Sequence, residues 1–185
     1  MKERIISETI HQIQQKGFKF TISDLARQLA VSKGTIYEHF SSKDELIAEI
    51  INRIIFQITE KGKQIIENEE LDLLEKIKQI LIYIPEEFEL MDVRLLSDLK
   101  RYHYDQWIKL DQFLNEEWSM VLLLMEKGIE DGTIKRIHLP LFVELYLGAI
   151  NQIYNPKFLV KHQFSMGEML QSIMEILLHG ISNKK

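Results

Sequence analysis

The sequence contains no cysteine and has few residues that break regular secondary structure. Its 185 residues include three prolines and eight glycines. The absence of cysteine excludes disulfides, thiolate zinc sites and cysteine nucleophiles. The scarcity of proline and glycine, together with abundant Ile, Leu, Glu, Lys and Gln, favours helices over sheets. Hydrophobic residues make up 45% and charged residues 28%, which is typical of a folded globular chain with one large domain or two small ones.

Long apolar segments are also absent. The longest wholly apolar run, Met120–Met125, is far shorter than the ~18 residues that a membrane span needs. Residues 1–8 carry charges of both signs and have no apolar centre, so they do not resemble a signal peptide. The sequence therefore predicts a cytoplasmic protein without a membrane partner.

Positive charge is in short supply, and the formal net charge is −5. Taken alone, this charge argues against a nucleic-acid binder, because phosphate attracts cations. The charge is unevenly distributed, however. Residues 1–53 hold eight Lys/Arg against seven Asp/Glu, a net +1, and the remaining residues hold fifteen against twenty-one, a net −6. The acidity thus belongs to the C-terminal part, and we expect only modest non-specific affinity for DNA.

Apolar spacing and capping residues predict helices throughout, with no convincing strand. Thr21 with Asp24, and Ser42 with Glu45, have the spacing of capping boxes, and Gly17 stands where a helix-ending glycine is expected. The predicted fold is all-α, with a compact N-terminal unit at 1–47 and a larger helical bundle at 48–185. The predicted helices, about nine, cover residues 2–16, 21–30, 32–38, 43–68, 72–84, 85–101, 104–131, 140–154 and 165–179.

Two short helices joined by a tight turn, within 21–39, form a candidate helix-turn-helix. The second of these helices is short enough to lie in the major groove of DNA. Its first turn has unpaired backbone N–H groups, which favour phosphate oxygens. Ile36 and Phe40 are expected to face the core. The groups available to bases or phosphates in and after this helix are Ser32, Lys33, Gly34, Thr35, Tyr37 and His39.

Lys43 opens the next predicted helix, where a cation opposes the helix dipole. A bound phosphate would remove this conflict. A packed core position is the alternative for His39, and a solvated surface is the alternative for the other polar residues.

This stretch resembles the TetR (tetracycline-repressor-like) family of bacterial regulators. Residues 31–46, Val-Ser-Lys-Gly-Thr-Ile-Tyr-Glu-His-Phe-Ser-Ser-Lys-Asp-Glu-Leu, match the pattern V-S-x-G-T-[IL]-Y-x-H-F-x-S-K-[DE]-x-L. Gly17-Phe18 and 21–27 extend the likeness, and 128–134 resembles the segment that often ends the family's seventh helix. Two features depart from the pattern: Glu8-Thr9 replaces a common Ala-Ala pair, and Ala30 stands where glycine is common in the turn.

The resemblance implies a DNA-binding homodimer with a small-molecule effector, in which 1–47 is a helix-turn-helix DNA-binding domain and 48–185 is a helical ligand-binding and dimerisation domain. It implies that Thr21 caps its helix and touches phosphate, that Ser23 and Lys33 face bases, and that Thr35 lies near base or backbone. It also implies that Tyr37, His39 and Lys43 hold phosphates, and that the last two helices dimerise.

The C-terminal part offers further candidate sites. The aromatic side chains expected to line a ligand pocket are Trp107, Trp118, Phe142 and Tyr146, with ordinary core packing as the alternative. Apolar stripes on the last two helices predict a dimer interface at Leu145, Ile150, Leu170, Ile173, Met174 and Leu177. Glu175 and His179 lie at i,i+4 without a third ligand, so no metal site is expected.

The functional hypothesis from the sequence is a ligand-responsive transcriptional regulator, a repressor, that binds near-palindromic double-stranded operator DNA as a homodimer. A small apolar or amphipathic ligand, of unknown identity, would release it. No cofactor and no enzymatic activity are expected. The alternative is a helical ligand-binding or protein-binding module whose N-terminal unit no longer reads DNA specifically.

Overall fold

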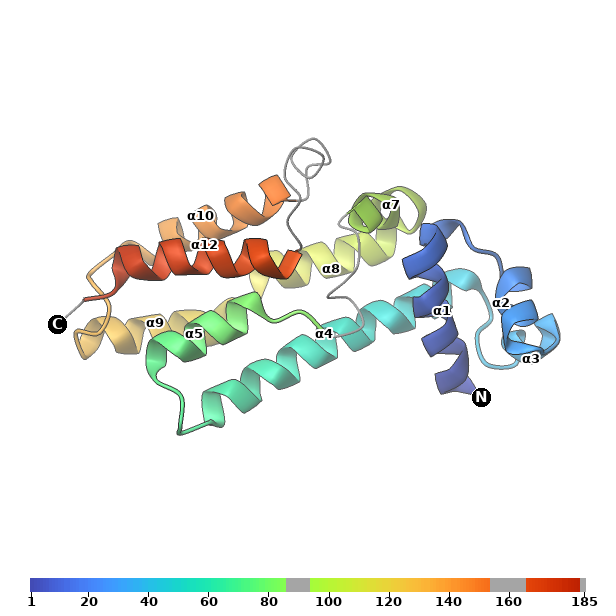
Figure 1. Ribbon diagram of the computed structural model, residues 1–185, viewed down its shortest axis with the longest axis horizontal. Helices are drawn as coiled ribbons and strands as arrows, with labels where there is room; N and C mark the ends of the chain where they lie inside the picture. The colour runs from blue at the N-terminus through green and yellow to red at the C-terminus, as the bar shows by residue number, and fades with distance from the viewer. Residues whose placement is uncertain (86–93, 154–165, 184–185) are drawn as a thin grey trace. The chain divides into compact units, whose positions relative to one another are not determined.

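The computed structural model describes residues 1–85, 94–153 and 166–183. The predicted all-α fold is confirmed in this part of the chain, where the only β-type pairing is an isolated bridge between Ile134 and Ser182. Figure 1 shows the helices, which are α1 (Lys2–Lys16), α2 (Ile22–Leu29), α3 (Lys33–Tyr37), α4 (Lys43–Glu67), α5 (Leu73–Ile82), α7 (Arg94–Tyr102), α8 (Tyr104–Glu116), α9 (Ser119–Glu130), α10 (Leu139–Ile153) and α12 (Met166–Ile181), with a 3-10 turn, η1 (Gly17–Lys19).

The chain divides into two compact units. The first comprises Met1–Ile55 and Met91–Asp111, and the second comprises Phe56–Leu90 and Gln112–Lys185. This division differs from the boundary expected at 47/48, because α4 continues to Ile55 within the first unit and part of the later chain packs there as well. The added segment contacts the N-terminal part of this unit through α7, which packs on η1.

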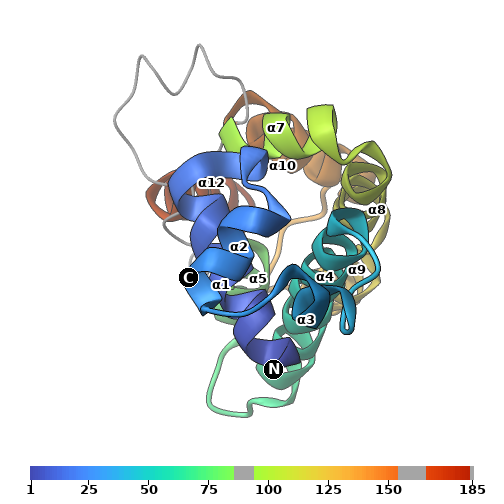
Figure 2. The same ribbon diagram turned by 90° about the vertical axis from the view of Figure 1, so that its right-hand side faces the viewer.

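The first unit is built around α1, and α2 packs on both α1 and α3 (Figure 2). Side chains at helical spacing on α1 point into one core, because residues three and four apart lie on the same face of a helix. Ile5, Ile6 and Ile13 are almost fully buried there, as are Leu25 and Ile36. The result is a compact support that leaves the outer surface of α3 free to carry polar groups.

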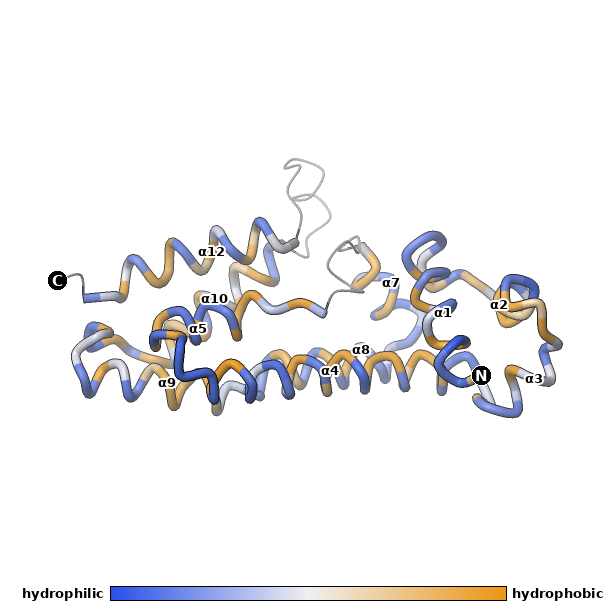
Figure 3. Tube along the Cα trace, turned by 60° about the horizontal axis from the view of Figure 1, so that its bottom comes forward, coloured by the Kyte–Doolittle hydropathy of each residue, from blue (hydrophilic) through white to orange (hydrophobic). Residues whose placement is uncertain are grey.

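The second unit places α5 against both α9 and α12, and α12 against α10. Apolar and polar residues alternate around these helices, as Figure 3 shows by colour, so each helix has one face to bury. The core residues are Ile77, Trp118, Val121, Leu124, Met125, Ile134, Phe142, Tyr146, Met174 and Leu178. Among the described helices, none is long and apolar enough to cross a membrane.

Two helix predictions in the middle of the chain need correction. The helix predicted for 104–131 is interrupted between α8 and α9, where the Trp118 N–H donates to the Glu116 carbonyl oxygen and not to a carbonyl four residues back. No glycine or proline marks this break. It coincides with burial of the Trp118 indole, so tertiary packing overrides the local helical pattern. Pro85, expected to begin a helix, follows the end of α5 in non-helical backbone, and residues 86–93 lie outside the described part.

Gly128 and Gly132 shape the end of α9. A Cβ at Gly128 would lie 2.7 Å from Cδ1 of Ile134, so glycine permits the close approach of this side chain. Gly132 follows the helix with a φ of 80°, a conformation that favours glycine. The expectation that the helix stops at Gly132 is confirmed.

Candidate nucleic-acid interface

Helix α2 begins at a capping box, as the sequence predicts. The Thr21 hydroxyl oxygen accepts from the Asp24 N–H at 3.1 Å, and the Thr21 N–H donates to Asp24 Oδ2 at 3.0 Å. The Thr21 hydroxyl also donates to Asp24 Oδ2 at 2.7 Å. These donors, the hydroxyl first and the N–H second, hold the pKa of Asp24 below its usual value. Thr21 itself is exposed, so the cap fixes the helix start while leaving the residue accessible from outside.

The turn between α2 and α3 depends on Ala30. Its φ of 54° and ψ of 43° put it in the left-handed region that usually favours glycine. In return, the Ala30 N–H bonds to the Arg27 carbonyl at 3.2 Å and the Val31 N–H bonds to the Ala26 carbonyl at 3.0 Å. The departure from glycine noted in the sequence is therefore accommodated by strain at one residue, and the turn keeps its geometry.

Helix α3 is capped at its start and held at its back. The Ser32 hydroxyl oxygen accepts from the Thr35 N–H at 3.0 Å, and the Ser32 and Thr35 hydroxyl groups lie 3.0 Å apart. Ile36 and Phe40 are buried, as expected. The cap and the two apolar contacts fix the rotation of the helix about its axis, and this rotation decides which residues face outward.

The outward face of α3 brings together most of the residues expected to contact DNA. Ser32, Lys33, Gly34, Tyr37 and His39 are all exposed, and Thr35 is half-buried. Tyr37 exposes 49% of its surface, which is unusual for a large aromatic side chain with no partner to cover it. The exposure of His39 rules out the alternative of a packed core histidine. Ser23, on α2, is half-buried.

The backbone of Gly34 does not itself require glycine. Its φ lies outside the range that favours glycine, and a Cβ there would meet only the Ser32 hydroxyl oxygen, at 3.3 Å. This contact is tight, and the Ser32 oxygen is already held by the Thr35 N–H, so a side chain at position 34 would press on the cap of α3. The expectation that Gly34 lets the backbone come close to DNA stays a prediction.

The surroundings of Lys43 differ from those expected from the sequence. Its ammonium group donates to the carbonyl oxygens of Phe18 and Phe20, and it lies 4.2 Å from the centre of the Phe20 ring. Partial burial lowers the pKa of Lys43, and the neighbouring Asp44 opposes this change. The conflict with the helix dipole is thus met by internal acceptors, and an external phosphate is not needed for that purpose. Contact of Lys43 with phosphate stays a prediction.

The second capping box is only half formed. The Glu45 N–H donates to the Ser42 hydroxyl oxygen at 3.0 Å, as expected. The Glu45 carboxylate, however, accepts from the N–H and the hydroxyl of Ser41, both at 2.6 Å, and not from the Ser42 N–H. These two bonds hold the pKa of Glu45 below its usual value. Their net effect is the same, because the chain before α4 is still tied to its first turn.

A buried histidine links α4 to the start of α8. His103 is 8% exposed, its Nδ1 lies 2.6 Å from Asp44 Oδ1, and its ring packs on Phe18 with centroids 5.4 Å apart. Burial lowers the pKa of His103, and the bond to Asp44 opposes that effect. Sequence reasoning missed this contact, because nothing in the local pattern relates residues 44 and 103.

The four aromatic residues expected to line a ligand pocket are not brought together as a group. Trp107 lies in the first unit, where Lys100 Nζ sits 5.3 Å from its ring centre. Trp118 and Tyr146 meet edge to face at 5.4 Å in the core of the second unit, which also contains Phe142. The Tyr146 hydroxyl donates to the Leu81 carbonyl oxygen. These three residues pack as core, the alternative considered for them.

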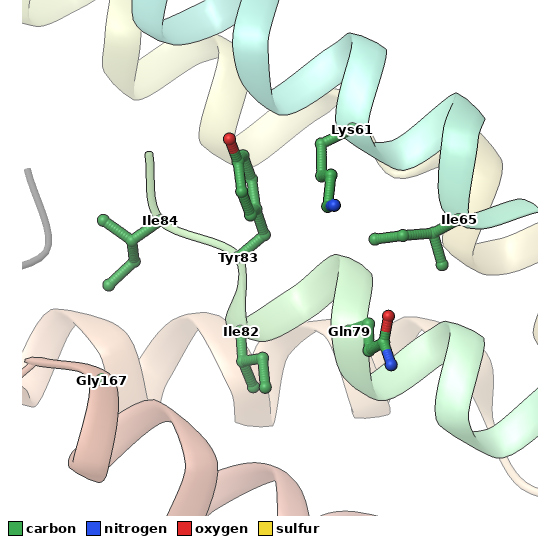
Figure 4. A pocket seen from close by; sticks show the side chains of 7 residues that line it. All are labelled: Lys61, Ile65, Gln79, Ile82, Tyr83, Ile84 and Gly167. Carbon is green, nitrogen blue, oxygen red and sulfur yellow. The ribbon is translucent and has the colours of Figure 1, made fainter. Parts of the chain in front are cut away.

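A pocket is present elsewhere in the second unit, with a volume of about 250 Å³. Figure 4 shows the residues that line it: Lys61, Ile65, Gln79, Ile82, Tyr83, Ile84 and Gly167. None of these was singled out from the sequence. The sequence nevertheless held one signal for Lys61: the positions three and four residues away on α4 hold no acidic residue, so no ion pair within the helix is expected for it.

The residues expected at the dimer interface fall into three groups. Met174 is fully buried and Leu170 is 6% exposed in the subunit's own core, so they offer almost no surface to a partner. Ile150, Ile173 and Leu177 are half-buried against that core. Leu145, in contrast, is 55% exposed. Leu141 on α10 and Ile176 on α12 are also exposed, at 57% and 73%, and Ile176 was not expected.

No group of three His, Asp or Glu side chains that could hold a metal ion occurs among the residues described. The one metal-like pair from the sequence forms a different contact, since His179 Nδ1 lies 2.7 Å from the Glu175 carbonyl oxygen.

The capped, outward-facing α3 and the helical second unit define a helix-turn-helix protein with a C-terminal helical bundle. The family model for bacterial regulatory proteins of the tetR family matches residues 5–50. An HTH-type transcriptional regulator of Bacillus subtilis, YvaF, described as uncharacterized, is 46% identical over 98% of this chain and 96% of its own length. The chain belongs to the tetR family of transcriptional regulators, which are not enzymes.

More distant relatives share the fold. The fatty acid metabolism regulator protein of Bacillus subtilis is 23% identical over 98% of this chain and 95% of its own length. A crystal structure of the transcriptional regulator FadR from Bacillus subtilis, in complex with stearoyl-CoA, matches with a TM-score of 0.68 and 20% identity. It covers 98% of this chain and 100% of its own.

Proposed function

We propose that this protein is a cytoplasmic, homodimeric repressor that binds a near-palindromic operator in double-stranded DNA. The observation that carries the proposal is the outward face of α3, where Lys33, Gly34 and Tyr37 are exposed on a helix whose other side is anchored by Ile36 and Phe40. Such a helix is rigid before DNA arrives, so binding requires little ordering of the protein. A two-fold dimer would present two copies to successive half-sites.

The charges of the N-terminal unit set the expected character of the binding. Lys33 forms no ion pair with any described residue, whereas Arg27 is held by Asp24 at 3.2 Å and Arg53 by Glu3 at 2.6 Å. With Lys2 paired to Glu49 as well, three of the eight Lys and Arg residues in 1–53 are ion-paired, so part of the positive charge of this unit is already neutralised. We expect tight binding to depend on the dimer and on placed contacts, and the salt dependence to be shallower than that of a strongly basic protein.

Release would follow from differential affinity. A ligand that binds better to one arrangement of the two reading helices shifts the population toward it, and operator affinity falls by the same coupling energy. An amphipathic ligand is supported by the apolar bundle and by the likeness to a regulator whose structure holds stearoyl-CoA. Stearoyl-CoA is therefore the first compound to test as a releasing agent.

A gel-shift experiment with DNA from around the protein's own gene tests the proposal. The wild-type protein is expected to shift one fragment specifically, and Lys33→Ala and Tyr37→Ala are each expected to weaken that shift. Lys63→Ala is the control, because Lys63 is an exposed lysine of α4 paired with Glu60 at 2.7 Å. The proposal fails if no fragment shifts above competitor DNA, or if all three variants behave alike.

The second candidate function is a helical binding module that no longer reads DNA. It is favoured by one observation, the single lysine on α3 of an acidic chain. A partner captured independently of DNA and of salt, with no specific gel shift, would support this candidate over the repressor.

A further inference from the structure

Lys61 is an exposed cation that forms no ion pair with the residues that the structure describes. Its nearest acidic neighbour along the helix, Glu60, pairs instead with Lys63 at 2.7 Å. Other lysines of the second unit are engaged as well: Lys76 donates to the Ile66 carbonyl at 2.6 Å, and Lys78 lies 3.9 Å from Glu175. No hydrogen bond or ion pair joins Lys61 to another described residue, although residues 54–185 carry a net charge of −6.

The side chain of Lys61 belongs to the pocket wall. Figure 4 shows it directed into the space beside the Tyr83 ring, with Ile65 approaching from the neighbouring turn of α4. The one carboxylate of α5, Glu75, accepts from the amide of the lining residue Gln79 at 2.9 Å. The pocket thus has a cation at its wall, and the carboxylate of α5 is hydrogen-bonded to an amide.

Two further features of the pocket fit a ligand with a charged head and an apolar body. Ile65, Ile82 and Ile84 supply apolar lining. Gly167 lines the pocket from the first turn of α12, where backbone N–H groups lack partners within the helix and favour negative charge; Glu168 is the acidic residue of this turn. A Cβ at Gly167 would meet nothing within 4 Å, so this end of the pocket is open.

We propose that this pocket binds an anionic amphiphile, with the Lys61 ammonium holding a carboxylate or phosphate head and the isoleucines covering the chain. The inference rests on the proposed function, because it assigns the class of the releasing ligand and the place where it binds. It predicts that a neutral or cationic head on the same chain binds more weakly. A hydrogen bond between charged groups accounts for a difference of about tenfold or more in affinity.

Direct titration calorimetry of the full chain, without DNA, tests the inference with four eight-carbon probes: octanoate, octyl phosphate, octan-1-ol and octylamine. We expect the anionic probes to bind best, and the stronger of the two identifies the head group as carboxylate or phosphate. Lys61→Met should weaken the anionic probes about tenfold or more and leave octan-1-ol unchanged. Lys61→Arg should retain the preference for anions. Lys63→Met is the matched control and should bind as the wild type does.

Equal binding of all four probes, no binding of either anion, or equal losses in Lys61→Met and Lys63→Met would overturn the inference. Because Lys61 is exposed, Lys61→Met is expected to melt within a few degrees of the wild type, and a melting curve verifies this. Operator binding measured on the same samples separates the two proposals. An intact gel shift without an anion preference refutes only the pocket, and an anion preference without a gel shift refutes only the repressor.

Discussion

Replacing Lys43 with methionine separates a structural role of this lysine from a role in DNA binding. The change removes the hydrogen bonds from the ammonium group to the Phe18 and Phe20 carbonyl oxygens, and its position over the Phe20 ring. Each hydrogen bond from a charged donor contributes about 1.5–3 kcal/mol. Since Lys43 is only half-buried, water replaces part of that loss, and we expect the free energy of unfolding to fall by about 2–3 kcal/mol.

For a chain of this size, each kcal/mol corresponds to roughly 2–4 °C in melting temperature, so Lys43→Met should melt about 4–12 °C lower. Lys33→Met is the matched variant. Lys33 is exposed and has no ion pair among the described residues, so its replacement should change the unfolding free energy by less than about 0.5 kcal/mol. Circular dichroism melting measures both variants.

Fluorescence anisotropy with a labelled operator fragment measures the operator affinity of the same two variants. At a temperature where both variants are folded, Lys33→Met should weaken operator binding more than Lys43→Met does. If Lys43→Met instead melts with the wild type and loses most of its operator affinity, the internal role assigned to Lys43 is wrong and its ammonium group serves DNA.

Three further predictions concern the turn, the dimer and the buried histidine. Ala30→Gly relieves the backbone strain at a φ of 54° and should raise the free energy of unfolding in chemical denaturation by up to about 1 kcal/mol. A lower free energy of unfolding would contradict the strain. Met174→Ala leaves a cavity at a fully buried site and should lower the free energy of unfolding, measured by chemical denaturation, by about 2–5 kcal/mol. Leu145→Glu should instead raise the dimer dissociation constant, measured by ultracentrifugation, with little loss of subunit stability. The reverse pattern would contradict the assignment of Met174 to the core and of Leu145 to the dimer interface. Because burial puts the pKa of His103 below the ordinary 6.5, its contribution to stability is full above about pH 6.5 and is lost as the pH falls toward the folded-state pKa. Denaturation midpoints between pH 7.5 and 5 should fall less steeply in His103→Gln than in the wild type, with the exposed-site variant His39→Gln as the control.

Local chemistry explains the parts of the molecule that the sequence predicts well. The capping box at Thr21, the cap at Ser32 and the buried side of α3 all depend on residues three or four positions apart, so the sequence alone reveals them. The exposure of Lys33 and Tyr37 follows from the same spacing once Ile36 is assigned to the core.

Contacts between residues distant in sequence explain the parts of the molecule that the sequence predicts poorly. The break before α9 depends on the burial of Trp118 against Tyr146, 28 positions away, and carries no local signal. The apolar stripe of α12 contains both Met174, which is buried, and Ile176, which is exposed, and spacing alone does not tell how wide a face the subunit's own core covers. The Lys61 pocket likewise depends on α4, α5 and α12 meeting in space.

The central claim is that two copies of α3 read two half-sites of one operator. Hydroxyl-radical footprinting of the own-gene fragment tests this claim most directly. We expect two protected segments, related by two-fold symmetry and centred about 34–36 Å apart or a small multiple of that distance, and Lys33→Ala should weaken both together. A single protected segment, or protection that Lys33→Ala leaves unchanged, would contradict the account.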